Sequence, residues 1–128
     1  MNKTNSRPIE LIVCNTCRYN SNFAEQLQQP GAGLVKMLLE ANLPKQICVR
    51  QIKCLSNCSK GCSIAIRGIG RWTYIYGNIN PTEHLSSIVD VAKKYLNTSD
   101  GIIPWRQRPE HFRKNCVARI PPNEMYYE

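Results

Sequence analysis

The chain has 128 residues, the length of one domain, and its 42% hydrophobic and 20% charged residues are typical of a globular protein. No run of about 18 apolar residues occurs, which excludes a membrane-spanning helix. The net charge is +8, from 17 Lys and Arg against 9 Asp and Glu. Because no nucleic-acid recognition motif accompanies this charge, it favours solubility or an acidic partner over nucleic acid.

The first part of the chain predicts a strand, a helix and a second strand. Residues 9–13 are rich in β-branched side chains and predict a buried strand that ends at Cys14. Apolar residues at helical intervals then predict a short helix that begins near Gly31. Residues 47–53 alternate as a strand does, and this strand leads directly to Cys54.

A hairpin and a closing helix are predicted next. Residues 63–67 and 71–77 form the two strands, joined by a glycine-bearing turn. Asn80 has the features of a helix cap, because Pro81 follows in the first turn and Glu83 stands three residues after the cap. The apolar face of this helix consists of Leu85, Ile88, Val89, Ala92, Tyr95 and Leu96. The predicted core order is therefore β-α-β-β-β-α.

Beyond the last helix the periodicity ends, and prolines, arginines and aromatic residues dominate the sequence. We therefore expect residues 9–98 to form the domain, with residues 1–8 as a flexible tail. Residues 99–128 are expected to form an irregular, basic, proline-rich extension and not a second domain. Trp105 and Phe112 are the residues expected to anchor this extension on the domain.

Five of the seven cysteines form two tight groups. Cys14 and Cys17 have CxxC spacing, and Cys54, Cys58 and Cys62 have CxxxC spacing between neighbours. Such short spacings let neighbouring thiolates converge on one centre, as a soft metal requires. The pattern therefore indicates thiolate coordination or thiol redox chemistry.

Three kinds of chemistry are compatible with these groups. A 2Fe-2S cluster and a zinc site, in a structural or metal-delivery protein, both use four thiolates. A thiol-disulfide oxidoreductase would use Cys14 and Cys17, because thioredoxins have their reactive CxxC after the first strand. Residues 18–22 predict no immediate helix, however, and this third interpretation gives the second cysteine group no role. An electron carrier or metal-binding protein is therefore favoured over an enzyme.

The other cysteines and both histidines are interpreted without a functional role. Cys48 lies in a predicted strand and is expected in the core, whereas Cys116 is an isolated thiol in the extension. His84 and His111 are interpreted as surface residues, because neither has a partner at metal-ligand spacing.

The order of elements and motifs resembles the thioredoxin-like 2Fe-2S ferredoxins over residues 9–97. The stretch that carries the resemblance is Cys54-Leu55-Ser56-Asn57-Cys58, followed by a hairpin that ends Tyr76-Gly77-Asn78-Ile79-Asn80-Pro81. The motifs Cys-x-x-Cys-Arg, Cys-Leu-Ser-Asn-Cys-Ser-Lys-Gly-Cys and Pro-Trp-Arg-Gln-Arg-Pro-Glu also resemble a family of predicted metal-binding proteins. Members of that family often lie near cobalamin or cobalt genes.

The resemblance implies a thioredoxin-like fold and one 2Fe-2S cluster bound by Cys14, Cys17, Cys54 and Cys58. It further implies one-electron transfer or redox sensing, with a link to cobalamin or metal metabolism. This sequence departs from the thioredoxin-like ferredoxins in the close spacing of its first pair and in its fifth thiol. Cys62 is therefore either an alternative ligand, in place of Cys17, or an exchangeable thiol beside the cluster.

The charges beside the cysteines bear on partner and compartment. Arg18, Lys53 and Lys60 would offset the negative charge of a cluster, and a basic protein of this kind fits an acidic redox partner. Residues 1–10 lack the apolar stretch of a signal peptide, and seven cysteines cannot all pair as disulfides. We therefore expect a cytoplasmic protein without membrane insertion, and a homodimer is left open.

Overall fold

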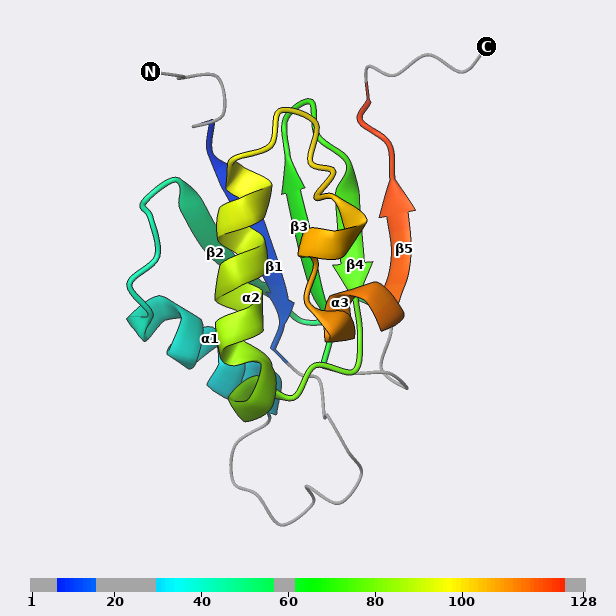
Figure 1. Cartoon of the computed structure of the whole chain (residues 1–128). Coiled ribbons are helices and arrows are strands. Elements are labelled where there is room, and N and C mark those ends of the chain that lie inside the picture. Colours follow the sequence, from blue (N-terminus) through cyan, green and yellow to red (C-terminus); the bar gives the residue numbers. More distant parts are fainter. Residues whose placement is uncertain (1–6, 16–29, 57–61, 124–128) are drawn as a thin grey trace.

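The fold is that of a computed structural model, which describes residues 7–15, 30–56 and 62–123. In chain order, the elements are β1 (Ile9–Cys14), α1 (Pro30–Glu40), β2 (Ile47–Ile52), β3 (Ile64–Gly68), β4 (Thr73–Tyr76), α2 (Pro81–Leu96), the 3-10 helix η4 (Trp105–Gln107), α3 (Glu110–Lys114) and β5 (Cys116–Ile120) (Figure 1). No helix in these residues is long and apolar enough to cross a membrane.

The strands form one sheet in the order β2-β1-β3-β4-β5. β1 and β2 are parallel and are connected through α1, as parallel neighbours require a crossover. The other neighbouring pairs are antiparallel. The predicted β-α-β-β-β-α order is confirmed. Its consequence for the site is that β1 and β2 end at the sheet edge where β3 begins.

Helices cover one face of the sheet, and the hydrophobic core lies between them and the strands. Side chains alternate along a strand, so Ile9, Leu11 and Val13 of β1 point to the same face, where each is at most 1% exposed. Figure 1 shows α2, η4 and α3 on one side of the sheet. The helices contribute these buried residues to the core: Leu34, Val35, Leu38, Ile88, Val91, Ala92, Tyr95, Leu96 and Phe112.

An ion-pair network lies on the opposite face of the sheet. Glu10 alternates with the core residues of β1, and its carboxylate lies 2.6 Å from Arg67 of β3 and 2.9 Å from Arg50 of β2. The hydrogen bond from Arg67, followed by that from Arg50, holds the pKa of Glu10 below its ordinary value. This carboxylate therefore links the three strands β2, β1 and β3.

The last part of the chain is not the irregular extension that the sequence predicts. Residues 105–120 form η4, α3 and β5, and β5 extends the sheet beside β4 with a bulge near Tyr76. Phe112 is 1% exposed and meets the Tyr76 ring edge-on at 4.7 Å, as expected of an anchor. Trp105, in contrast, is 58% exposed. The strand escaped prediction because all five of its residues are exposed, so it shows no apolar alternation.

Candidate metal centre

The topology brings three cysteines to one edge of the sheet. Cys14 is the last residue of β1 and pairs with Ile52, the last residue of β2. Cys54 follows Ile52 by two residues, and Cys62 precedes the start of β3 by two. Backbone hydrogen bonds from Asn15 to Ile52 and from Cys14 to Ser63, 2.8 and 3.2 Å long, hold these segments together. Segments that are far apart in the sequence thus become neighbours, because β1 and β2 end side by side and β3 begins beside the end of β1.

Cys14 is fixed at this edge by burial and by its thiol. It is 1% exposed, and its Sγ donates to the carbonyl of Lys53 at 3.4 Å. This contact places the Cys14 sulfur against the residue that directly precedes Cys54. A metal ligand is a thiolate, which carries no proton to donate, so metal binding would replace this hydrogen bond.

Cys54 is exposed, and its sulfur already accepts a backbone hydrogen bond. The N–H of Ser56 donates to Cys54 Sγ at 3.1 Å. Ser56 has a φ of 60°, in the left-handed region that residues other than glycine seldom adopt. In this conformation the Ser56 N–H points toward the Cys54 sulfur. Amide donors of this kind stabilise negative charge on sulfur, which is what a thiolate ligand or a cluster requires.

Cys62 is completely buried, and its backbone is held on the other side by the segment before α2. Its N–H and carbonyl bond reciprocally to Ile79, at 3.4 and 3.0 Å. Asn80 then caps α2 by accepting from the N–H groups of Thr82 and Glu83, both at 3.1 Å, as the sequence predicts. The N-terminus of α2 therefore lies at the same edge as the cysteines.

The second member of each predicted ligand pair, Cys17 and Cys58, lies outside the described residues, as do Arg18 and Lys60. Within the described part of the chain, no group of three or more His, Cys, Asp or Glu side chains could hold a metal ion. Only two of the four predicted ligands, Cys14 and Cys54, fall in that part. The four-thiolate set therefore stays a prediction.

The two other cysteines are exposed. Cys48 is expected in the core from the sequence, but it is exposed. It lies on the edge strand β2, with its side chain on the face opposite the helices. Cys116 lies at the start of β5, and partial burial is the main cause that raises the pKa of its thiol.

The structure also brings together two histidines that the sequence treats as unrelated surface residues. The rings of His84 and His111 stack with their centroids 3.8 Å apart. His84 Nδ1 accepts from the N–H of Asn80 at 2.8 Å, and His111 Nε2 donates to the carbonyl of Gly77 at 3.1 Å. No spacing rule could find this pair, because it depends on α3 folding back onto the start of α2.

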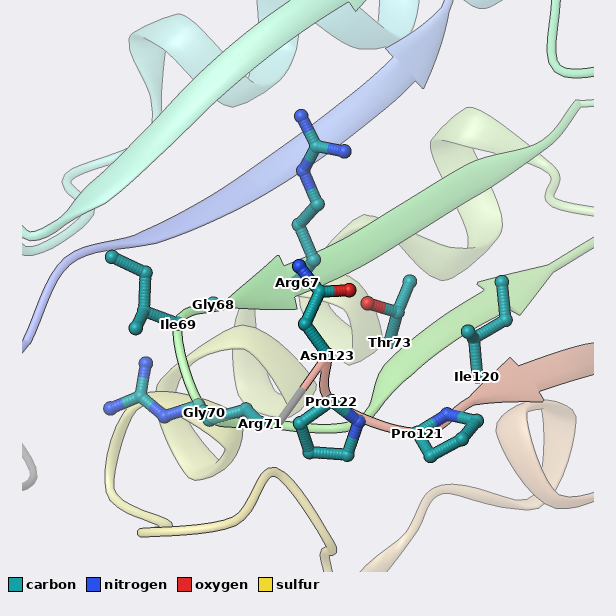
Figure 2. A pocket seen from close by; sticks show the side chains of 10 residues that line it. All are labelled: Arg67, Gly68, Ile69, Gly70, Arg71, Thr73, Ile120, Pro121, Pro122 and Asn123. Atoms are coloured by element: carbon teal, nitrogen blue, oxygen red, sulfur yellow. The ribbon is translucent and has the colours of Figure 1, made fainter. Parts of the chain in front are cut away.

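A hollow of about 330 Å³ lies at the opposite edge of the sheet, between the β3–β4 turn and the residues after β5 (Figure 2). Two arginines line it, and both already have partners. Arg67 binds Glu10, and Arg71 donates to the carbonyls of Leu96 and Thr98. The hollow is therefore a weaker candidate for a functional site than the cysteine edge.

Comparison with known families gives a match over most of the chain. A family described as a protein of unknown function, DUF1636, matches residues 11–122. The chain belongs to this family. The search of curated proteins gave no match.

Two solved structures resemble this DUF1636 member. One is described as a thioredoxin-like [2Fe-2S] ferredoxin from Aquifex aeolicus, with a TM-score of 0.57, 15% identity, and coverage of 94% of this chain and 99% of that one. The other is described as the wild-type thioredoxin-like [2Fe-2S] ferredoxin from the same organism, with a TM-score of 0.53, 14% identity, and coverage of 88% and 98%. The predicted thioredoxin-like fold is confirmed.

Proposed function

We propose that the protein binds one 2Fe-2S cluster through Cys14, Cys17, Cys54 and Cys58 and acts in one-electron transfer or redox sensing. The observation that carries the proposal is the Ser56 N–H that donates to Cys54 Sγ at the edge where Cys14 also lies. The cluster, when bound, supplies a centre that accepts one electron from a partner and passes it on. The likeness of fold to ferredoxins supports this choice of cofactor.

The protein's own residues would hold and insulate the centre. Cys14 would bind the centre from the interior of the protein, and Cys54 would bind it from the exposed side. Lys53 is exposed beside Cys54, and its charge would offset the negative charge that increases on reduction. We place this function in the cytoplasm, where reducing conditions keep thiols available as ligands.

The burial of Cys14 counts against the thiol-disulfide oxidoreductase. An attacking thiol must be accessible and is activated as a thiolate in electropositive surroundings. Cys14 is 1% exposed, and its thiol donates to a carbonyl. A zinc site would use the same thiolates as a 2Fe-2S cluster, so metal analysis is needed to distinguish zinc from the cluster.

The test is anaerobic purification followed by absorption spectroscopy and analysis of iron, sulfide and zinc. We expect a brown protein with visible charge-transfer bands and about two irons per chain. A colourless protein with about one zinc per chain would show that the four thiolates form a structural zinc site.

Single serine variants identify the ligands. We expect C14S and C54S to lose the visible absorption, whereas C48S keeps it, because Cys48 is an exposed cysteine of β2 on the far face of the sheet. C17S and C62S form the deciding pair. Loss of the cluster in C62S with retention in C17S would replace Cys17 by Cys62 in the ligand set.

A further inference from the structure

Two arginines are stacked on aromatic rings on the helix-covered side of β4 and β5. The Arg119 guanidinium lies 4.6 Å from the ring centroid of Trp72. Arg108 lies over two rings, 5.5 Å from that of Tyr74 and 5.4 Å from that of Trp105. Stacking of this kind fixes a guanidinium group in one orientation and leaves the N–H groups at its edge accessible for hydrogen bonds. In Arg108 the Nε–H already donates to the carbonyl of Ile103 at 2.7 Å, so its terminal nitrogens are the ones considered for a ligand.

The two stacks are adjacent and partly open to solvent. Tyr74 pairs directly with Arg119 across β4 and β5, so their side chains share a face of the sheet. Figure 1 shows η4, which carries Trp105, over this face beside β4. Trp105 is 58% exposed. We call the four residues Trp72, Trp105, Arg108 and Arg119 the Trp105 surface.

The Trp105 surface is basic and lacks counter-charges of its own. Within the described residues, neither Arg108 nor Arg119 has a carboxylate within ion-pair distance. The segment 104–123 carries five Lys and Arg against one acid, Glu110. Glu110 is already paired with Lys114 at 2.8 Å. An ordered arginine without a carboxylate partner can form a bidentate ion pair with a carboxylate of another molecule.

We propose that the Trp105 surface binds an acidic protein partner that presents an apolar side chain among its carboxylates. Trp and Arg are the residues that most often dominate the binding energy of protein interfaces, and here they occur together with unmatched positive charge. A protein fits better than a single-stranded nucleic acid, because Arg108 covers one face of the Trp105 ring on which a base would stack. The inference is independent of the metal that the cysteines bind.

The test uses the ¹⁵N-labelled full chain and a synthetic peptide, acetyl-Glu-Asp-Phe-Asp-Glu-amide, at low ionic strength. We expect saturable shifts of the indole N–H signals of Trp72 and Trp105 and of the Nε–H signals of Arg108 and Arg119. R108Q and R119Q should each weaken binding by about fivefold, as removal of one exposed charge pair does. Added salt should weaken it further.

A matched double variant controls for net charge. R108Q/R119Q and K36Q/K45Q remove two charges each, but Lys36 and Lys45 are exposed on α1 and before β2. We expect only R108Q/R119Q to weaken binding of the peptide. R119Q alone serves if R108Q disturbs the fold, because Arg108 also donates to the carbonyl of Ile103 at 2.7 Å.

Two results would overturn the proposal. One is equal weakening by both double variants, which would mean that only the total charge matters. The other is tighter binding of oligothymidine than of the peptide with the same tryptophan shifts, which would identify a nucleic-acid surface.

Discussion

At Gly101 the fold depends on the absence of a side chain. The residue has a φ of +86°, and a Cβ there would lie 2.9 Å from the backbone nitrogen of Trp72 and 2.9 Å from the Tyr95 ring. The N–H of Trp72 donates to the carbonyl of Asp100, so the backbone on both sides is fixed. Gly33 is the opposite case. It lies in α1, and a Cβ added there would have no atom within 4 Å.

We therefore expect opposite effects of alanine at these two glycines. G101A should lower the free energy of unfolding by about 1–3 kcal/mol, because it combines backbone strain with a steric clash. G33A should raise it by about 0.5–1 kcal/mol, because alanine restricts the unfolded chain at a helical position. Urea unfolding measures both, and a neutral G101A would contradict the structure.

The C-terminal end of α2 is held by a buried arginine and not by a glycine. Arg71 is 1% exposed and donates to the carbonyls of Leu96, Thr98 and Arg7, each at 3.3 Å. A cation at a helix C-terminus also meets the negative end of the helix dipole. Arg71 thereby connects the turn between β3 and β4 to the end of α2 and to Arg7, two residues before β1.

Removal of this side chain should be costly. R71M leaves the buried carbonyl of Leu96 and the part-buried carbonyls of Thr98 and Arg7 without this donor, and should lower the free energy of unfolding by about 3 kcal/mol. R67Q is the control, since Arg67 is an exposed partner of Glu10 and its loss should cost less than about 1 kcal/mol. Similar losses in the two variants, measured by urea unfolding, would refute the role of Arg71 as the cap.

On the scale of the whole molecule, the His84–His111 stack connects the last part of the chain to the cysteine edge. His111 and Asn115 of the α3 region bond to the backbone of Gly77, and Ile79, two residues on, bonds to Cys62. Burial first, and then the charge of His111, hold the pKa of His84 below its ordinary value of 6.5, whereas Glu83 opposes this. The neutral ring is therefore the form that the fold favours.

Stability should consequently fall as the pH drops below 6.5, because the unfolded chain then binds a proton at His84 before the folded chain does. Urea unfolding at about pH 7.5 and 5.5 measures this loss, and H84Q should reduce it. Glu10 and Glu110, whose pKa values are lowered from 4.5, do not titrate in that window. If the pH dependence of stability is unchanged in H84Q, His84 is not the group that causes it.

The sequence by itself determined the order of the core elements, the cap at Asn80 and the grouping of the cysteines, because periodicity, capping and spacing are local signals. Tertiary structure alone decided that the Ser56 N–H donates to the Cys54 sulfur, that His84 meets His111, and that β5 completes the sheet. These features depend on which segments become neighbours in space. A strand of exposed residues or a pair of distant histidines leaves no periodic trace in the chain.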